Sequence, residues 1–352
     1  MKKVFVLMLL CFSCFIQAAL AYEYEVVNLG SGNAYGINEF DQIVGSRNIS
    51  GSERAVIWDV NMQVEDIGTL GGSWARALDI NNLGQIVGTS QIAGSSGLTH
   101  AFCWSSNVGI QDLGIQASWS NAYSINDSSE IVGDAYMSYP IGYVRAFIKD
   151  NSGGSTQILG SLGDTRSGAR NINSSGQVVG SSDGTDGYVH AFFWDGEMQN
   201  LETTQSHAYD INDNKVAVGD ARISGNNTPA IWDIDSGSVI YLEALAASNA
   251  CATSINNSGW VVGGANGKAF LWDSSNGARD LIGLIDPASG WTLQLANAIN
   301  EKGQIVGSGT FNGVSSAFLL NPTRVVPEPV SMLLFGVGGL TLAAARKLRK
   351  IK

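Results

Sequence analysis

The sequence repeats one short pattern seven times, and this repetition limits the possible folds more than any other feature. The pattern Ala-x-x-Ile-Asn is followed in every copy by a Val-Gly pair whose Gly lies seven positions after the Asn. The spacing from one Asn to the next is 43, 45, 47, 39, 44 and 44 residues. A period of this length predicts a repeat architecture, in which one small unit buries its faces against copies of itself. The copies begin at Ala34, Ala77, Ala122, Ala169, Ala208, Ala252 and Ala296.

Each copy divides into four short segments that are predicted to be β-strands. In the second copy these are residues 77–81, a segment centred on 85–88, residues 100–104 and residues 110–114. The turn-forming sequence Asn82-Leu83-Gly84 separates the first two segments, and the third, HAFCW, is rich in the aromatic residues that strands favour. No part of the repeat region has a sustained helical period, so the sequence predicts an all-β fold.

The seventh copy lacks a fourth strand, and this gap predicts how the chain closes. After Ser316–Leu320 no such segment follows, but a matching one, Tyr24–Gly30, precedes the first copy. A ring explains this placement, because the N-terminal strand then completes the last sheet. We therefore predict a seven-bladed β-propeller over residues 22–322, with four antiparallel strands per blade. The alternative is a stacked β-solenoid. The motif Ala and Gly are expected to be small because the blades converge near the axis.

The two ends of the chain carry targeting features. Residues 1–21 predict a secretory signal peptide for signal peptidase, with Lys2 and Lys3, an apolar run and Ala19-Leu20-Ala21. Residues 323–352 contain an uncharged run at 330–345 and then basic residues, which predicts a single, short C-terminal transmembrane helix with its basic end inside. A permanent anchor is the alternative to a processed signal. The tail consists of Val326, Pro327, Glu328 and Pro329, the apolar run, and the flanking Arg346, Lys347, Arg349 and Lys350.

The charge of the exported part argues against nucleic acid as a partner. All 31 acidic residues lie within residues 22–330, whereas two of the 20 basic residues lie in the signal segment and five in the tail, so this part carries a formal net charge of −18. Such a surface repels phosphate backbones and anionic lipid heads. Cys103 and Cys251 are too far apart in the sequence to suggest a disulfide framework, and we expect both to be buried thiols.

Two resemblances follow from these motifs. The tail resembles the PEP-CTERM sorting signal of Gram-negative bacteria, which implies recognition of the Pro-Glu-Pro segment by an exosortase-type enzyme after inner-membrane anchoring. Residues 24–320 resemble the HAF family of extracellular repeats, through N-x-x-G-Q-I-V-G and the triplets His100-Ala101-Phe102 and His190-Ala191-Phe192. The first and fifth copies depart from the triplet. The family implies an exported repeat domain without an assigned activity.

No catalytic motif or complete metal site stands out. The residue before Ala-Phe in the third strand is charged or His in five copies, and we expect it to lie opposite Thr89, Asp134 or Ser181 on the second strand, as a cross-strand pair rather than an anion site. The loops at 183–187 and 233–237 resemble calcium-binding turns only in part. Three scattered histidines give no metal-ligand spacing, and no cofactor is expected. The five residues are Arg54, His100, Arg145, His190 and Lys268.

Loop lengths suggest where a ligand would bind. In a four-stranded meander, the loops between second and third strands and the links between blades share one rim, and these are the long and variable ones here. Aromatic side chains among Asn, Ser and Gly on this rim suit the stacking of sugar rings. The alternative is that the Trp rings cover the grooves between blades. The residues are Trp74, Trp119 and Trp291 in blade links, and Tyr136, Tyr139, Tyr143 and Tyr188 in loops.

The function expected from these features is a non-catalytic binding or structural role in the cell envelope or extracellular matrix, in contact with exopolysaccharide. The alternative is a hydrolase or lyase that acts on an extracellular polysaccharide. A pocket with convergent carboxylates and basic groups on the irregular rim would favour the enzyme, whereas an aromatic shelf would favour binding.

Overall fold

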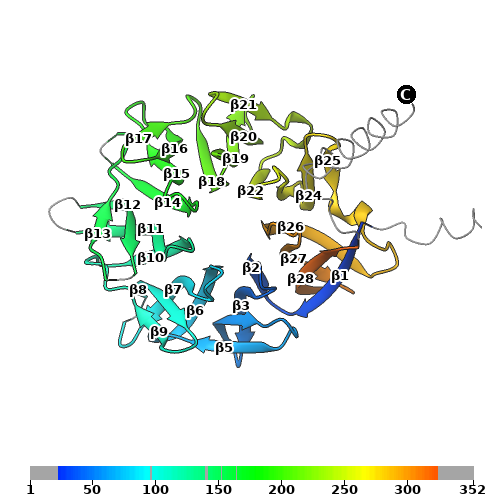
Figure 1. Ribbon diagram of the computed structural model, residues 1–352, viewed down its shortest axis with the longest axis horizontal. Coiled ribbons are helices and arrows are strands. Elements are labelled where there is room, and N and C mark those ends of the chain that lie inside the picture. Colours follow the sequence, from blue (N-terminus) through cyan, green and yellow to red (C-terminus); the bar gives the residue numbers. More distant parts are fainter. Residues whose placement is uncertain (1–22, 96, 139–141, 152, 164, 324–352) are drawn as a thin grey trace, which may run out of the picture.

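The computed structural model describes residues 23–323, except 96, 139–141, 152 and 164. Within this part the chain forms seven antiparallel four-stranded sheets arranged around a central axis (Figure 1). The prediction of a seven-bladed propeller is therefore confirmed. The expected signal peptide, the Pro-Glu-Pro segment and the apolar run at 330–345 lie outside the described residues. Among the described residues, no helix is long and apolar enough to cross a membrane.

The blades follow the chain order. Blade 1 contains β2 (Asn33–Ile37), β3 (Ile43–Ile49), β4 (Ser52–Trp58) and β5 (Val64–Gly68); blade 2 contains β6 (Gly71–Ile80), β7 (Ile86–Ile92), β8 (Thr99–Ser105) and β9 (Gly109–Asp112); blade 3 contains β10 (Ser120–Ile125), β11 (Glu130–Met137), β12 (Tyr143–Asp150) and β13 (Thr156–Ile158). Blade 4 contains β14 (Ser167–Ile172), β15 (Val178–Asp183), β16 (Val189–Trp194) and β17 (Met198–Asn200); blade 5 contains β18 (Ser206–Ile211), β19 (Val216–Ile223), β20 (Asn226–Asp233) and β21 (Ser238–Tyr241). Blade 6 contains β22 (Cys251–Ile255), β23 (Val261–Ala265), β24 (Lys268–Asp273) and β25 (Gly277–Asp280); blade 7 contains β26 (Trp291–Ile299), β27 (Ile305–Phe311), β28 (Val314–Pro322) and β1 (Tyr24–Gly30). Two short 3-10 helices, η1 (Glu243–Leu245) and η2 (Leu281–Leu284), lie in blade links.

The N-terminal strand closes the ring, as the missing fourth strand predicted. Strand β1 pairs antiparallel with β28, from Tyr24 opposite Pro322 to Gly30 opposite Ala317. The pairing continues beyond the strands, because the Thr323 N–H donates to the Glu23 carbonyl at 2.9 Å. The Trp58 indole N–H of blade 1 also donates to the Leu29 carbonyl at 3.1 Å, which links the closing strand to the first blade.

The core consists of apolar layers between neighbouring sheets. Seven buried clusters occur, one at each blade interface, and the one between blades 1 and 2 combines Ile57 and Ile67 with Ile86 and Phe102. The sheet faces are thus buried against copies of the same unit, which is why the sequence repeats.

The motif Gly is required within a blade rather than between blades, which differs from our expectation. In each blade the first strand has a β-bulge directly after the motif Ala, as between Ala77 and Asp79. The bulge brings a carbonyl of the first strand against the motif Gly of the second. A Cβ on Gly88 would lie 2.0 Å from the Arg76 carbonyl oxygen and 3.0 Å from the Phe102 ring. No side chain fits there.

The residue before Ala-Phe in the third strand lies opposite a residue of the second strand that is one position further along the chain than predicted. His100 lies opposite Ser90 rather than Thr89, and Arg145 lies opposite Ala135 rather than Asp134. The reason is that the motif Gly must face the Phe ring, as Gly88 faces Phe102, which places Thr89 opposite Ala101. In three blades the side chain instead pairs with an Asp of the fourth strand: Arg54 with Asp66 at 2.9 Å, His100 with Asp112 at 2.6 Å and Lys268 with Asp280 at 3.2 Å.

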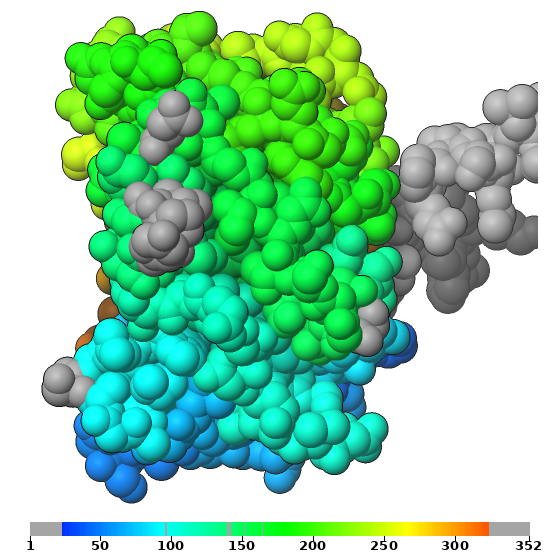
Figure 2. Space-filling view, turned by 90° about the vertical axis from the view of Figure 1, so that its left-hand side faces the viewer, coloured from blue at the N-terminus to red at the C-terminus, as the bar shows by residue number. Residues whose placement is uncertain are grey.

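The two rims of the ring differ. We call the rim with the turns between first and second strands, such as residues 82–84, the turn rim. The rim with the blade links and second-to-third loops, such as residues 115–119 and 184–188, is called the loop rim. Figure 2 shows the outer side of the ring at blades 3 and 4, in cyan-green to green.

Candidate functional site

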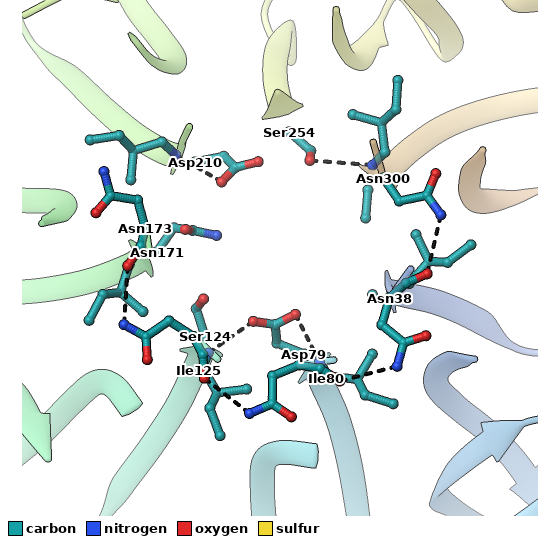
Figure 3. Close-up of a pocket in the computed structure, with 18 of the residues that line it drawn as sticks. Asn38, Asp79, Ile80, Ser124, Ile125, Asn171, Asn173, Asp210, Ser254 and Asn300 are labelled. Carbon is teal, nitrogen blue, oxygen red and sulfur yellow. Dashed lines mark hydrogen bonds between the residues drawn. The ribbon is translucent and has the colours of Figure 1, made fainter. Parts of the chain in front are cut away.

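The innermost strands enclose a polar funnel on the axis. Its volume is about 380 Å³, and its wall comes from the first strand of every blade together with the start of the following turn. Figure 3 shows these side chains converging from all sides. Among the described residues that line the funnel, Arg170 is the only basic one, while Asp79 and Asp210 are acidic and lie near the axis.

The seven motif Asn side chains form a closed ring of hydrogen bonds around this funnel. In each blade the Asn Nδ2 donates to the backbone carbonyl of the motif Asn in the next blade, at 3.0–3.2 Å. The last bond, from Asn300 to the Asn38 carbonyl, joins blade 7 to blade 1 (Figure 3). The members are Asn38, Asn81, Asn126, Asn173, Asn212, Asn256 and Asn300.

Each ring Asn also holds its own turn together, which explains the Gln of the repeat. Asn173 Oδ1 accepts from the Ser175 and Gln177 N–H groups, while its Nδ2 donates to Gln177 Oε1 at 2.8 Å and to the Asn212 carbonyl at 3.2 Å. An amide side chain has two donors and two acceptor sites, so Asn173 is fully satisfied. The same four bonds occur at Asn38, Asn81 and Asn126.

Two carboxylates below the ring are also committed to bonds between blades. Asp79 Oδ2 accepts from the Ile125 N–H at 2.9 Å, and Asp210 Oδ2 accepts from the Ile255 N–H at 2.8 Å. Burial raises the pKa of each carboxyl to about 6, although these hydrogen bonds favour the charged form. Both therefore lose much of their charge in mildly acidic solution.

The residues that follow the ring Asn form a second circle at the funnel mouth. In six of the seven blade interfaces, the backbone N–H at this position donates to the side chain of the equivalent residue in the next blade, at 2.8–3.0 Å. The seven ring Asn residues and the residues that follow them thus join blade to blade, and we assign these groups a structural role. The residues are Glu39, Asn82, Asp127, Ser174, Asp213, Asn257 and Glu301.

A second cavity opens on the loop rim between blades 3 and 4. This cleft has a volume of about 340 Å³. Trp119 lies on one side and Arg166 with Asp183 on the other, while Arg170 and His207 also line it. Burial raises the Asp183 pKa, but hydrogen bonds from Arg166 and Thr165 outweigh this and hold the pKa below its usual value. Asp134, which lines the same cleft, is buried, and burial raises its pKa.

The predicted rim residues have different surroundings. The Trp119 and Tyr136 rings stack, with centroids 6.4 Å apart and an angle of 16°. Trp74 is half-buried on blade 2, with the Arg76 guanidinium 5.5 Å from its ring centroid. Tyr143 and Tyr188 are 44% and 60% exposed. Tyr139 lies outside the described residues.

Trp291 does not lie on the exposed rim, and this part of the prediction is wrong. It is only 8% exposed and packs against Phe311 and Phe318 in the core between blades 6 and 7. An additional bulge between Leu293 and Leu295 shifts β26 by one position, which turns Trp291 to the inner face. For this residue the alternative, a ring that covers a groove between blades, describes the structure.

The loops at 183–187 and 233–237, which partly resemble calcium-binding turns, form hydrogen bonds within the protein. Asp186 accepts from His190 Nε2 at 2.9 Å, and Asp233 Oδ1 accepts from the Ser236 N–H at 3.1 Å. No group of three or more His, Cys, Asp or Glu side chains in the described part of the chain is arranged to hold a metal ion. Cys103 and Cys251 are free thiols, and burial raises the pKa of each to about 11.

The comparisons with known proteins support the fold alone. No protein-family model matches the chain, and no curated protein matches its sequence. Among solved structures, an oligogalacturonate lyase from Vibrio parahaemolyticus is similar with a TM-score of 0.57 and 9% identity, over 86% of this chain and 95% of that one. The β-propeller domain of the Trilobed protease from Pyrococcus furiosus, which has an open velcro topology, gives 0.53 and 11% identity over 86% and 99%.

A third similar structure is TolB from Acinetobacter baumannii, with a TM-score of 0.46 and 12% identity over 62% of this chain. The chain spans about half of that protein, 54% of its length. At such low identities the likeness does not decide whether this propeller is an enzyme, because propellers of both kinds share the scaffold.

Proposed function

We propose that this chain is an exported, non-catalytic binding and structural protein of the cell envelope or extracellular matrix, which contacts exopolysaccharide through its loop rim. The main support is the difference between the axial funnel and the cleft on the loop rim. The ring Asn side chains of the axial funnel are engaged in bonds that join the blades, whereas the loop rim carries the stacked Trp119–Tyr136 pair beside an open cleft. Aromatic faces next to planar polar groups suit sugar rings.

The export part of the proposal rests on the sequence of the two ends. Residues 1–21 are proposed to be removed by signal peptidase, and the segment Val326–Pro329 with its apolar and basic flanks to be recognised by an exosortase-type sorting enzyme. A C-terminal epitope tag tests this in the producing bacterium, because a processed tail loses the tag from the extracellular form. A chain with the Pro327-Glu328-Pro329 segment replaced by Ala should keep the tag in the membrane fraction.

The binding part is tested by retention on the producer's own polysaccharide. Replacing Trp119 and Tyr136 together by Ala should weaken retention by about tenfold or more, since buried aromatic anchors are worth at least about 1–2 kcal/mol. Phe40→Ala is the matched control, because Phe40 is an aromatic residue that is 60% exposed on the opposite, turn rim. Equal retention of the double variant, the control and the original chain would exclude this rim as the contact surface.

The alternative is a hydrolase or lyase that acts on an extracellular polysaccharide. Its one supporting observation is that Asp134 and Asp183 line the same cleft with pKa values shifted in opposite directions, as in pairs of a general acid and a base. Incubating the polysaccharide with the purified chain separates the two functions. New reducing ends or unsaturated sugars would establish the enzyme, whereas unchanged polymer length with measurable retention would support binding.

A further inference from the structure

We propose that the cleft between blades 3 and 4 is a sugar subsite that accepts an uncharged, hydroxyl-rich ring and rejects acidic sugars. This inference rests on the proposed function, and it adds the position of the site and the class of its ligand.

The two walls of the cleft come from the same structural position in neighbouring blades. Trp119 and Arg166 each lie three residues before a motif Ala, and each pairs with the second strand of its own blade. The Tyr136 N–H donates to the Trp119 carbonyl at 3.0 Å, and the Asp183 N–H donates to the Arg166 carbonyl at 2.8 Å. Because these backbone bonds extend the sheets, both side chains are held by rigid elements rather than by a free loop.

The blade 3 side of the cleft is aromatic. Trp119 is half-buried and stacks on Tyr136, so its ring is supported from behind and loses little freedom on binding. Such a ring offers an apolar surface to the C–H face of a sugar.

The blade 4 side is polar and planar. Arg166 Nε donates to Asp183 Oδ2 at 3.0 Å, and the Thr165 hydroxyl donates to the same oxygen at 2.9 Å. Within the described residues, the Arg166 Nη groups and Asp183 Oδ1 make no hydrogen bond, and the Arg166 side chain is 67% exposed. Donors and an acceptor side by side match neighbouring hydroxyl groups of a sugar, each of which donates and accepts.

His207 of blade 5 also lines the cleft. Its ring stacks on Tyr209, and its Nδ1 faces Asp220 Oδ2 at 3.5 Å, so residues of its own blade hold this side chain in place.

The charge of the protein around the cleft selects the ligand class. Arg166 and Arg170 balance Asp134 and Asp183, so the lining is close to neutral apart from His207. Residues 22–330 carry a net charge of −18. A uronate or sulfated sugar would bring a further negative charge to this acidic surface, at a cleft whose own charges already balance, whereas a neutral ring adds none. The volume of about 340 Å³ is near the lower end of ligand pockets, so the cleft holds a small part of a polymer.

Affinity electrophoresis of the full chain tests the inference. The gels contain dextran or galactomannan as neutral polymers, and alginate or polygalacturonate as polyuronates. We expect retardation by a neutral polymer only, and a loss of at least tenfold in affinity for Trp119→Ala and for Arg166→Lys, which keeps the charge but not the planar fork. Phe40→Ala is the control, because Phe40 is an exposed aromatic residue on the opposite, turn rim, and it should retain the affinity. Melting temperatures of the variants confirm that they fold.

The other outcomes are distinct. Preferential binding of a polyuronate would overturn the uncharged-sugar cleft while leaving polysaccharide binding by the rim intact. An equal loss in Phe40→Ala would overturn binding at the cleft, because the effect would then not depend on the loop rim. No retardation by any of the four polymers, together with no retention on the producer's polysaccharide, would overturn the proposed function itself. Retention on the producer's polysaccharide that Trp119→Ala and Arg166→Lys leave unchanged would overturn the cleft alone.

Discussion

Replacing one Asn of the axial ring should destabilise the propeller far more than replacing an exposed Asn. We choose Asn173, which is 4% exposed and makes four hydrogen bonds. Asn173→Ala removes all four and leaves two N–H groups of its own turn without a partner, while the Asn212 carbonyl keeps only its bond from the Lys215 N–H. Buried polar groups that lose a partner cost about 1–3 kcal/mol each, and part of this cost is recovered by water at the funnel. We expect a loss of about 3–5 kcal/mol in unfolding free energy.

The measurement is equilibrium unfolding in urea together with thermal melting. At about 2 °C per kcal/mol for a chain of this size, the melting temperature should fall by about 6–10 °C. Asn61→Ala is the control, because Asn61 is exposed in the turn between β4 and β5 and its side chain makes no hydrogen bond in the described structure. It should change stability by less than about 0.5 kcal/mol.

A second variant separates the bond between blades from the bonds within the turn. Asn173→Asp keeps an acceptor for the Ser175 and Gln177 N–H groups but removes the donor to the Asn212 carbonyl. It should be destabilised at neutral pH and recover in acid, because a protonated carboxyl donates again. If Asn173→Ala and Asn61→Ala differed by less than about 1 kcal/mol, the ring of Asn side chains would not be holding the blades together.

Three further predictions concern the bulge, the buried carboxylates and the closing strand. Gly180→Ala should cost about 3 kcal/mol because its Cβ would lie 2.1 Å from the Gly168 carbonyl oxygen, whereas Gly283→Ala, with open space around the new Cβ, should be neutral in the same melting assay. Because burial raises the pKa of Asp79 and Asp210 from 3.8 to about 6, the folded state binds protons more tightly than the unfolded state. The unfolding free energy should therefore rise as the pH falls from about 7 to 4, by about 2–3 kcal/mol per group. The variant with both Asp79→Asn and Asp210→Asn should show a weaker dependence of the unfolding free energy on pH, measured by urea titrations at several pH values. An unchanged dependence would mean that the protonation of these two carboxyls does not affect stability. Deleting residues 24–30 should abolish a single cooperative transition, and the synthetic 24–30 peptide should restore it by pairing with β28; a deletion variant that melts like the full chain would contradict closure by this strand.

The architecture was predictable because it follows from the spacing of the repeated motif along the chain. The seven copies of Ala-x-x-Ile-Asn gave the number of blades, and the displaced Tyr24–Gly30 segment gave the closure. The β-bulge was not predictable, since the three-residue step from Ala to Ile does not show an extra residue in a strand. The Gly that recurs seven positions after each motif Asn was its signal in the sequence. At Gly88 the reason is the close approach of the first strand, since a Cβ would lie 2.0 Å from the Arg76 carbonyl oxygen.

The ring of Asn side chains was missed for a geometric reason. Each bond joins residues about one repeat apart, such as Asn81 and Asn126, and a linear pattern gives no distance between them. The Gln four positions after the Asn was a usable signal, because Gln85 accepts from Asn81 Nδ2 at 2.7 Å. Trp119 and Trp291 both lie in predicted blade links, so the sequence suggested the same rim for both. An extra bulge in β26 instead places Trp291 in the core.

Hydrogen exchange in the presence of polysaccharide fragments distinguishes a structural axis with a binding loop rim from an axis that binds the ligand. We expect slower exchange on addition of ligand at residues 117–120, 165–168 and 181–183, which border the cleft between blades 3 and 4. Exchange at residues 38–42, 81–85 and 173–177, which form the funnel mouth, should not change. Protection confined to the funnel mouth would mean that the polar groups of the axis bind the ligand themselves, and binding on the loop rim would then be excluded.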